Sequence, residues 1–153
     1  MCAPHVTEPD PTGTAPAAAI RMALGDARVA PEQVGYVNAH ATSTPVGDPN
    51  EIRAIKQALG EAHASRCLVS STKSMHGHCL GAAGGIEAAL TALALDNGQI
   101  PPTINLDELD PECAGVDHVA NVARTASVEF AISNAFGFGG HNAALVFGRV
   151  ESS

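Results

Sequence analysis

The segment SSTKSMHGHCLGAAGG, at positions 70–85, brings together four side chains that can take part in chemistry: Lys73, His76, His78 and Cys79. Only 16% of the chain is charged, so this cluster stands out. An imidazole can move protons or bind a metal, a thiol can act as a nucleophile, and a lysine can supply positive charge. A further histidine, His40, lies in NAHATSTPVGD. Metal binding, nucleophilic catalysis and simple packing are the three readings to compare.

Two familiar motifs are incomplete in this chain. His76 and His78 form a His-x-His pair before a helix, but neither an HExxH pattern nor paired CxxC motifs support a zinc site. The glycines of FGFGG resemble a phosphate-binding loop, but no Lys-Ser/Thr follows them, and the dinucleotide-binding spacing fails at Asn142. Metal catalysis is therefore disfavoured, and a tight hairpin turn explains the glycines more simply.

The hydrophobic pattern predicts one domain over residues 17–150, preceded by a proline-rich loop at 1–16 and followed by a tail at 151–153. Helices are expected at 17–28, 50–59 and 79–97, and strands at 34–41, 66–72, 127–140 and 141–150. The last two strands should pair antiparallel through a glycine-rich turn. This order predicts an α/β fold with a mixed sheet flanked by helices.

Two local features refine this prediction. Asp48 is expected to be the N-cap of a helix that has Pro49 at its first position. The third helix contains Gly81, Gly84 and Gly85, each of which costs about 1 kcal/mol of helix stability relative to alanine. We therefore expect this helix to be buried, with neighbouring elements touching its backbone.

The composition limits the classes of function. The net charge is −8 and the eight basic residues are scattered, which disfavours a surface for nucleic acid or for an anionic membrane. No apolar run reaches the length of about 18 residues that spans a bilayer. The four cysteines show no regular spacing, which favours a reducing, cytoplasmic location over a disulfide framework.

The two histidine segments occupy equivalent positions along the chain. NAHATSTPVGD and SSTKSMHGH each follow a β-rich run and each carry a histidine after the strand. In a parallel sheet the carboxyl ends of neighbouring strands meet at one crevice, where ligands bind. His40 and His78 are therefore expected to face one pocket, with Lys73 beside them, although a purely structural histidine pair remains the alternative.

Four segments, VNAHATSTPVGDPNE, VSSTKSMHGHCLGAAGGIEA, IPPTINLD and SNAFGFGGHNAALVF, closely resemble in this order the C-terminal half of β-ketoacyl-[acyl carrier protein] synthases. The resemblance is to the elongating ketosynthases of type II fatty-acid synthesis and covers essentially the whole chain. It implies a thiolase-like fold, in which two α/β halves pack into five layers, αβαβα, and this chain is one half. It also implies decarboxylation of malonyl-carrier protein and attack of the resulting carbanion on an acyl thioester held by a cysteine.

The resemblance assigns roles to individual residues. It implies that His40 and His78 are catalytic and donate hydrogen bonds to the malonyl thioester oxygen, and that Lys73 polarises His78. It further implies that Glu87 anchors the base of the site, that Thr42 and Thr44 bind pantetheine, and that Phe138 is a gate whose backbone N–H contributes to the oxyanion hole. In some relatives the matching positions hold a monovalent cation, which here would be bound by Asn38, Glu87, Ser133 and Asn134. No cofactor is expected, because the phosphopantetheine arrives on the carrier protein. Taken without the family, Thr42 and Thr44 are turn hydroxyls and Phe138 is a hairpin core residue.

The chain departs from the family pattern in two places. His76 stands where many relatives have threonine, and we expect it to be a neighbour of the site and not a third catalyst. None of the four cysteines has the small-residue, strand-to-helix context of the family's nucleophile; Cys79 comes nearest but belongs to the histidine half. The chain alone is therefore expected to be inactive until a nucleophile-bearing half, on another chain or lost from this one, completes it.

The expected partners are the acyl carrier protein and the complementary ketosynthase half, within a complete enzyme that is dimeric. Two other interpretations stay open. The chain could be an inert partner of the chain-length-setting type, although the presence of His40, Lys73 and His78 speaks against this. It could instead belong to a polyketide ketosynthase, although the SSTKSM segment favours fatty-acid synthesis.

Overall fold

The structure is a computed structural model that describes residues 10–150. Its centre is a five-stranded sheet, in the order β4 (Asp117–His118), β2 (Leu68–Ser70), β1 (Val34–Asn38), β6 (Phe130–Phe136) and β7 (Asn142–Gly148). The first four strands run parallel, and β7 pairs antiparallel with β6. The short strands β3 (Gln99–Ile100) and β5 (Arg124–Thr125) form a separate antiparallel pair. The expected mixed sheet is confirmed, with β4 as an additional edge strand, and the β3–β5 pair lies outside this sheet.

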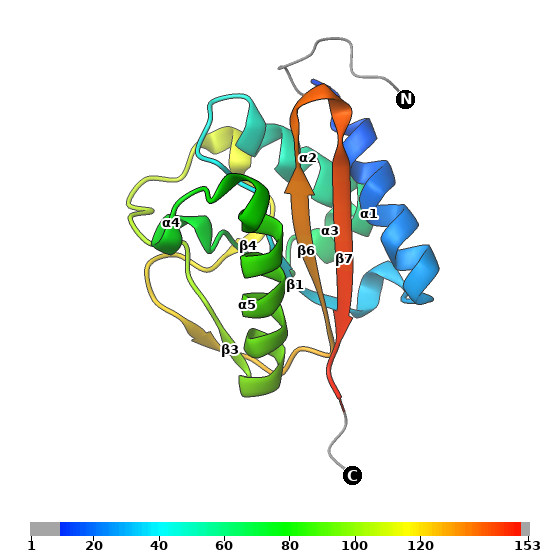
Figure 1. Cartoon of the computed structure of the whole chain (residues 1–153), viewed down its shortest axis with the longest axis vertical. Helices are drawn as coiled ribbons and strands as arrows, with labels where there is room; N and C mark the ends of the chain where they lie inside the picture. The colour runs from blue at the N-terminus through cyan, green and yellow to red at the C-terminus, as the bar shows by residue number, and fades with distance from the viewer. Residues whose placement is uncertain (1–9, 151–153) are drawn as a thin grey trace.

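Helices cover both faces of the sheet (Figure 1). Helices α1 (Thr14–Ala27), α2 (Gly47–Leu59) and α3 (Glu61–Ala64) lie behind the sheet in this view, and α5 (Ala83–Asn97) lies in front of it. The short helix α4 (Lys73–His76) connects β2 to the segment before α5. Single 3₁₀ turns occur at η1 (Pro31–Gln33), η2 (Leu80–Ala82), η3 (Pro111–Cys113) and η4 (Phe138–Gly140). No helix among residues 10–150 is long and apolar enough to cross a membrane.

Two hydrophobic clusters hold the layers together. On the side of α1 and α2, the core is built around Ile20, Leu24, Val37, Ile55 and Ile132. On the side of α5, it is built around Tyr36, Leu95, Ile100, Val119 and Ala131. Successive residues of a strand point to opposite faces, which is why Tyr36 and Val37 belong to different clusters. Both faces of β1 are therefore buried, which makes this strand a rigid support for the residues that follow it.

Two helix starts differ from the sequence prediction. Helix α1 begins at Thr14, so the end of the expected loop is helical; Pro16 fits because it lies in the first turn, where an N–H has no partner within the helix. Helix α2 begins at Gly47, and the prediction that Asp48 is its N-cap is wrong. The Asp48 carboxylate instead accepts bonds from the backbone N–H groups of Ser43 and Thr44 in the preceding loop.

The glycine-rich helix also differs from expectation. Helix α5 begins at Ala83 and not at Cys79, because residues 80–82 form the turn η2. A Cβ atom on Gly84 would meet Ala135 of β6 at 3.9 Å, whereas one on Gly81 or Gly85 would have no described atom within 4 Å. The expectation that neighbours touch this backbone is therefore wrong for Gly81 and Gly85. The side of α5 that carries Gly85 is therefore not covered there by other described residues.

Candidate active site at the carboxyl ends of β1 and β2

Two histidines meet where the parallel strands β1 and β2 end. Asn38 at the end of β1 is paired with Ser70 at the end of β2, and the chain continues from these positions to His40 and, through α4, to His78. The two imidazole rings lie edge to face, with centroids 5.5 Å apart and planes at 89°. The juxtaposition predicted from parallel strand ends is therefore present.

The hydrogen bonding of His78 defines where its ring proton lies. The backbone N–H of Leu80 donates to His78 Nδ1 over 3.3 Å. An acceptor nitrogen carries no proton, so the neutral ring has its proton on Nε2. The His78 side chain is exposed, and this Nε2–H is therefore a hydrogen-bond donor available at the surface of the described chain.

His40 is the more buried of the two residues, and its ring is neutral at neutral pH. Burial, the nearby positive charge of Lys73 and the neighbouring His78 lower the pKa of His40 from 6.5 to about 4. Its Nδ1 atom is buried and has no hydrogen-bond partner within residues 10–150. The ring packs against Phe136 of β6, with centroids 6.1 Å apart. At neutral pH His40 is therefore uncharged, and its ring lies beside the ring of His78.

A buried ion pair lies beneath the histidines. Lys73 in α4 pairs with Glu87 in α5, and their side chains are only 4% and 1% exposed. Lys73 Nζ donates to Glu87 Oε1, and within residues 10–150 no hydrogen bond joins Lys73 to His78. Its charge nevertheless reaches the site, because it contributes to the low pKa of His40. The pair links α4 to α5 and so ties the His78 segment to the helix that follows it.

A network of buried polar groups continues from this ion pair to the sheet. The Asn38 side-chain amide donates to Thr72 Oγ1, to Thr91 Oγ1 and to the Glu87 carbonyl, and its oxygen accepts the Thr72 N–H. Ser133 lies opposite Asn38 in the pairing of β1 with β6. Two buried oxygens, Glu87 Oε2 and Asn134 Oδ1, have no hydrogen-bond partner among the described residues.

The loop between β1 and α2 carries the two predicted pantetheine-binding threonines. Thr44 is exposed and its hydroxyl accepts the Gly47 N–H over 3.1 Å, which is the bonding of a turn residue. Thr42 is half-buried in the same loop. Phe138 lies in η4, between β6 and β7, and its side chain is 76% exposed. No described contact joins these three residues to the histidine rings.

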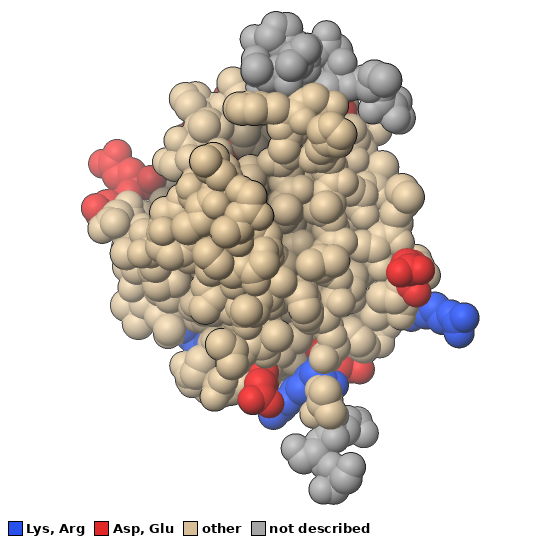
Figure 2. Space-filling view, viewed as in Figure 1, with Lys and Arg blue, Asp and Glu red and all other residues tan. Residues whose placement is uncertain are grey.

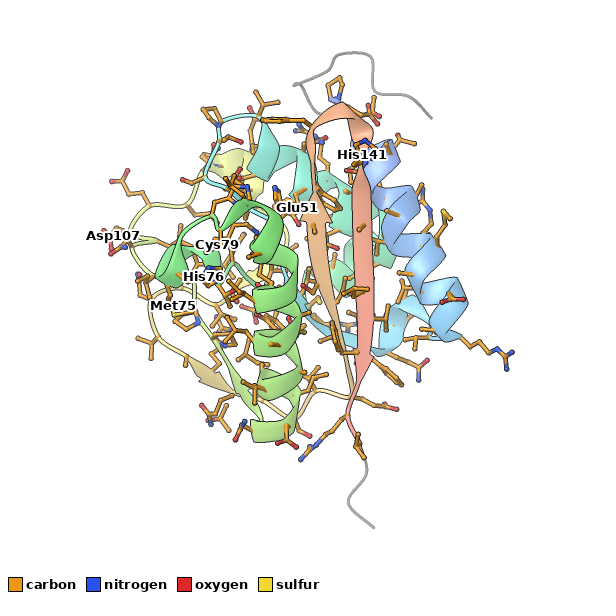
Figure 3. All side chains as sticks on the ribbon, viewed as in Figure 1. Glu51, Met75, His76, Cys79, Asp107 and His141 are labelled. Atoms are coloured by element: carbon orange, nitrogen blue, oxygen red, sulfur yellow. The ribbon has the colours of Figure 1, made fainter. Side chains whose placement is uncertain are left out.

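His76 and Cys79 contact one another on the segment before α5 (Figure 3). Cys79 Sγ is 3.9 Å from His76 Nδ1, while the other ring nitrogen of His76 lies 3.2 Å from Thr72 Oγ1. Within residues 10–150, no three His, Cys, Asp or Glu side chains are grouped so that they could hold a metal ion.

The other described cysteines are poorly suited to nucleophilic chemistry. Burial raises the pKa of the Cys67 thiol to about 12 and that of Cys113 to about 11. A nucleophilic cysteine needs a thiolate near neutral pH, and these two thiols stay protonated there. Cys2 lies outside the described residues.

The sequence reasoning missed one residue of this site, Glu51 of α2. Its carboxylate is buried and accepts the backbone N–H groups of His40 and Ala41. A signal was present in the sequence, because Glu51 lies four residues before Ile55 and therefore on the apolar face of a helix. A charged residue on such a face calls for a specific partner.

Comparison with known proteins places this arrangement in a family. Residues 2–107 match the family described as "Beta-ketoacyl synthase, C-terminal domain". The chain is 52% identical over 147 residues to the 3-oxoacyl-[acyl-carrier-protein] synthase 2 of Synechocystis sp., and 54% identical over 147 residues to that of Vibrio cholerae. These matches cover 96% and 95% of this chain but 35% of each relative, so the chain spans about a third of their length.

Solved structures agree with this placement. A β-ketoacyl synthase from Burkholderia phymatum superposes with a TM-score of 0.89 and 42% identity, over 97% of this chain and 35% of that one. A ketosynthase in complex with its type II polyketide acyl-carrier protein superposes with a TM-score of 0.92 and 37% identity, over 97% of this chain and 36% of that one. For the ishigamide ketosynthase/chain length factor the TM-score is 0.90 and the identity 38%, over 97% of this chain and 35% of that one. The predicted thiolase-like α/β fold is thus confirmed, and the chain belongs to the β-ketoacyl synthase family, of which it matches the C-terminal domain.

Proposed function

We propose that this chain supplies the decarboxylating half of a β-ketoacyl-[acyl carrier protein] synthase active site. The observation that carries the proposal is the pair of imidazoles, His40 and His78, with ring centroids 5.5 Å apart beyond the ends of two parallel strands. In the proposed reaction, malonyl-carrier protein loses CO2, and the carbanion attacks an acyl thioester held on a cysteine of the complementary ketosynthase half. The reaction joins the two carbon chains and releases that cysteine.

Two neutral donors suit the decarboxylation step. As the carbon–carbon bond to the carboxylate breaks, negative charge moves onto the thioester oxygen of the malonyl group. N–H donors aimed at that oxygen stabilise the enolate without the cost of burying further positive charge. The proton of His78 is on Nε2 because its Nδ1 accepts the Leu80 N–H. His40 stays uncharged at neutral pH because its pKa is lowered to about 4.

The surrounding residues take supporting roles in this proposal. Lys73, held by Glu87, keeps a positive charge near His40 and favours the neutral form of that imidazole. Thr42 and Thr44 contact the pantetheine arm. To do so, the Thr44 hydroxyl, which accepts the Gly47 N–H, either gives up this hydrogen bond or keeps it while it also contacts the arm. Phe138 closes over the acyl site, and its backbone N–H contributes to an oxyanion hole.

We also propose that buried oxygens near the histidines hold a monovalent cation. Glu87 Oε2 and Asn134 Oδ1 lack partners among the described residues, and carboxylate and amide oxygens are the ligands that hard cations prefer. Asn38, Glu87, Ser133 and Asn134 would hold the ion. When bound, it would neutralise part of the buried negative charge and stiffen the strand ends that support His40.

An uncovered apolar surface supports the need for a second half. On α5 and the turn before it, Leu80 is 78% exposed and Leu93 is 56% exposed, and Leu145 on the edge strand β7 is 52% exposed. Charged side chains are almost absent from this face and lie around its rim (Figure 2). Apolar surfaces of this kind mark association sites. The proposed occupant is the complementary ketosynthase half, since relatives are about three times as long as this chain.

Self-association of the chain tests this surface. We expect sedimentation velocity to show oligomers, because the apolar side of α5 will pair with itself when its partner is absent. Gly85→Glu should reduce this association without unfolding the chain, since a side chain there meets no described atom. Ala62→Glu, at an exposed position of α3, is the matched control and should leave association unchanged. A wild-type chain that sediments as a single monomer would contradict the proposal.

The decarboxylation itself can be measured in a chimera. The C-terminal third of the Vibrio cholerae synthase, 54% identical to this chain, is replaced by the chain, and CO2 release from malonyl-carrier protein is followed. His40→Ala or His78→Ala should slow release about 100- to 1000-fold, the usual cost of one oxyanion donor. The double variant should slow CO2 release by much less than the product of the two single-variant factors, because both histidines act on one oxygen. His76→Ala is the control; equal rates for all variants would exclude the proposed roles.

Two related functions are alternatives: a polyketide ketosynthase, and an inert partner of the chain-length-setting type. A type II polyketide ketosynthase bound to its acyl-carrier protein and the ishigamide ketosynthase/chain length factor also resemble this chain. Identity favours fatty-acid synthesis, because the chain is 52% and 54% identical to 3-oxoacyl-[acyl-carrier-protein] synthases but 37% and 38% identical to those two proteins. The proposed enzyme acts in the cytoplasm with an acyl carrier protein as its partner, and the complete form is dimeric.

A further inference from the structure

His76 and Cys79 form a thiol–imidazole pair that the proposed chemistry leaves unused. His76 is the last residue of α4, and Cys79 lies before the turn η2, on the segment that leads into α5 (Figure 3). We propose that this pair is a site of modification by small hydroperoxides, at which the Cys79 thiol is oxidised to a sulfenic acid. The modification does not depend on the proposed function, whereas its consequence for CO2 release rests on the role of His78.

The Cys79 thiol has a base beside it. Its Sγ atom lies 3.9 Å from His76 Nδ1, 3.6 Å from the His76 carbonyl oxygen and 3.8 Å from the Gly77 carbonyl oxygen. The two carbonyl oxygens can accept a hydrogen bond only, whereas the imidazole nitrogen can remove the proton and leave a thiolate. The thiolate is the form of cysteine that attacks electrophiles. Because Cys79 is half-buried and not fully buried, a small reagent can reach it.

A buried hydrogen-bond network fixes which nitrogen of His76 faces the thiol. The Thr72 hydroxyl donates to Asn38 Oδ1 over 3.3 Å, so its oxygen acts as an acceptor toward His76 Nε2, which is 3.2 Å away. The proton of the neutral His76 ring is therefore on Nε2, and Nδ1 presents its lone pair to Cys79. A nucleophile, a base and a third group that orients the base are the arrangement that activates a thiol.

The reaction that this arrangement supports is a single displacement at oxygen. His76 Nδ1 takes the thiol proton, and the Cys79 sulfur attacks one oxygen of the hydroperoxide. A sulfur–oxygen bond forms while the oxygen–oxygen bond breaks, and the leaving oxygen receives the proton from His76 and departs as water or an alcohol. The sulfur is oxidised and the peroxide is reduced by the same pair of electrons. The product is a sulfenic acid, which thiols reduce again through a mixed disulfide.

The position of Cys79 connects its oxidation to His78. Cys79 lies between His78 and Leu80, and the Leu80 N–H donates to His78 Nδ1, which sets the position of the ring proton. Leu80 has a φ of 50°, in the left-handed region that residues other than glycine seldom adopt, so this bond is made on a strained backbone. An added oxygen makes the side chain at the centre of the segment larger and more polar. We therefore expect oxidation to displace the His78 ring and to slow CO2 release.

The first readout is the rate of thiol oxidation in the 153-residue chain. The chain is treated with hydrogen peroxide in the presence of dimedone, which traps sulfenic acids, and tandem mass spectrometry assigns the adduct to individual cysteines. His76→Thr should slow the labelling of Cys79 at least about tenfold, because the base that removes the thiol proton is lost. If His76→Thr does not fold, His76→Gln should show the same loss.

A second histidine provides the matched control for this readout. His141 is exposed on the turn between β6 and β7, away from Cys79 (Figure 3). His141→Gln removes an imidazole without touching the thiol and should leave the labelling of Cys79 unchanged.

The second readout is CO2 release in the chimera with the Vibrio cholerae synthase. The nucleophilic cysteine of the complementary half is acylated first, so that its thioester protects it from peroxide. Peroxide is then added and destroyed with catalase, and a single turnover of malonyl-carrier protein is followed. A displacement of about 1 Å at a reacting group can cost about 100-fold in rate, so oxidation should slow this turnover at least about tenfold. Dithiothreitol should restore the rate, and Cys79→Ser should keep its untreated rate throughout.

The two readouts separate this inference from the proposed function. If the wild-type chimera releases no CO2 before peroxide is added, the proposed function fails, while dimedone labelling still tests the modification site. Labelling of Cys79 that is no faster than that of Cys67, or that is equal in the wild type and the folded His76 variant, overturns the proposal. Equal sensitivity of the wild-type and Cys79→Ser chimeras to peroxide also overturns it, because oxidation would then have no effect on His78.

Discussion

Breaking the buried Lys73–Glu87 pair should destabilise the fold far more than breaking an exposed pair. Both side chains are at most 4% exposed, and Glu87 Oε2 has no second hydrogen-bond partner among the described residues. Lys73→Met therefore leaves a buried carboxylate without its counter-charge, and Glu87→Leu leaves a buried ammonium. Removing one partner of a buried pair typically costs about 3–5 kcal/mol. This is a large share of the about 5–15 kcal/mol that holds a domain folded.

The double variant distinguishes charge from packing. When both partners become apolar residues of similar volume, no uncompensated charge is left, and the net change is often close to zero. We therefore expect Lys73→Met/Glu87→Leu to lie within about 1–2 kcal/mol of the wild type. The free energy of unfolding is measured by equilibrium urea denaturation followed by circular dichroism, with the slope checked for each variant.

A more exposed ion pair in the same chain provides the control. Lys56 and Glu61 lie 3.3 Å apart with side chains that are 25% and 79% exposed. Their replacement by methionine and glutamine should cost only about 0–1 kcal/mol, because water screens the charges. If Lys73→Met costs no more than Lys56→Met, or if the double variant costs the sum of its two single changes, the argument from burial is refuted.

Two further predictions concern titrating groups. The pKa of His40 is lowered from 6.5 to about 4, so its contribution to stability is complete above pH 6.5 and is lost as the pH falls toward 4. An NMR titration in which His40 protonates near pH 6.5 would contradict this. Iodoacetamide at pH 8 should alkylate the half-buried Cys79 well before Cys67, whose pKa of about 12 leaves only about one thiol in 10⁴ ionised; peptide mapping that finds Cys67 modified as fast as Cys79 would refute it.

The larger features of the fold could be predicted from local pattern. The apolar spacing over residues 17–28 and 50–59 indicated helices, and the β-rich runs around Tyr36 and Val69 indicated buried strands. The boundaries were less accurate, because a helix start depends on which group satisfies its first N–H groups. At α2 the Asp48 carboxylate turns back to the preceding loop, a choice that the sequence alone does not reveal.

The meeting of His40 with His78 followed from a rule of topology: histidines placed after neighbouring parallel strands arrive at one edge of the sheet. The sequence by itself thus determined the element types, the family resemblance and this pairing, because each depends on residue identity and order along the chain. Only the tertiary structure decided which tautomer His78 adopts, how far the pKa of His40 falls, and that Glu51 holds the His40 backbone. These properties depend on burial and on hydrogen bonds between atoms that are distant in sequence, and such contacts exist only once the chain has folded.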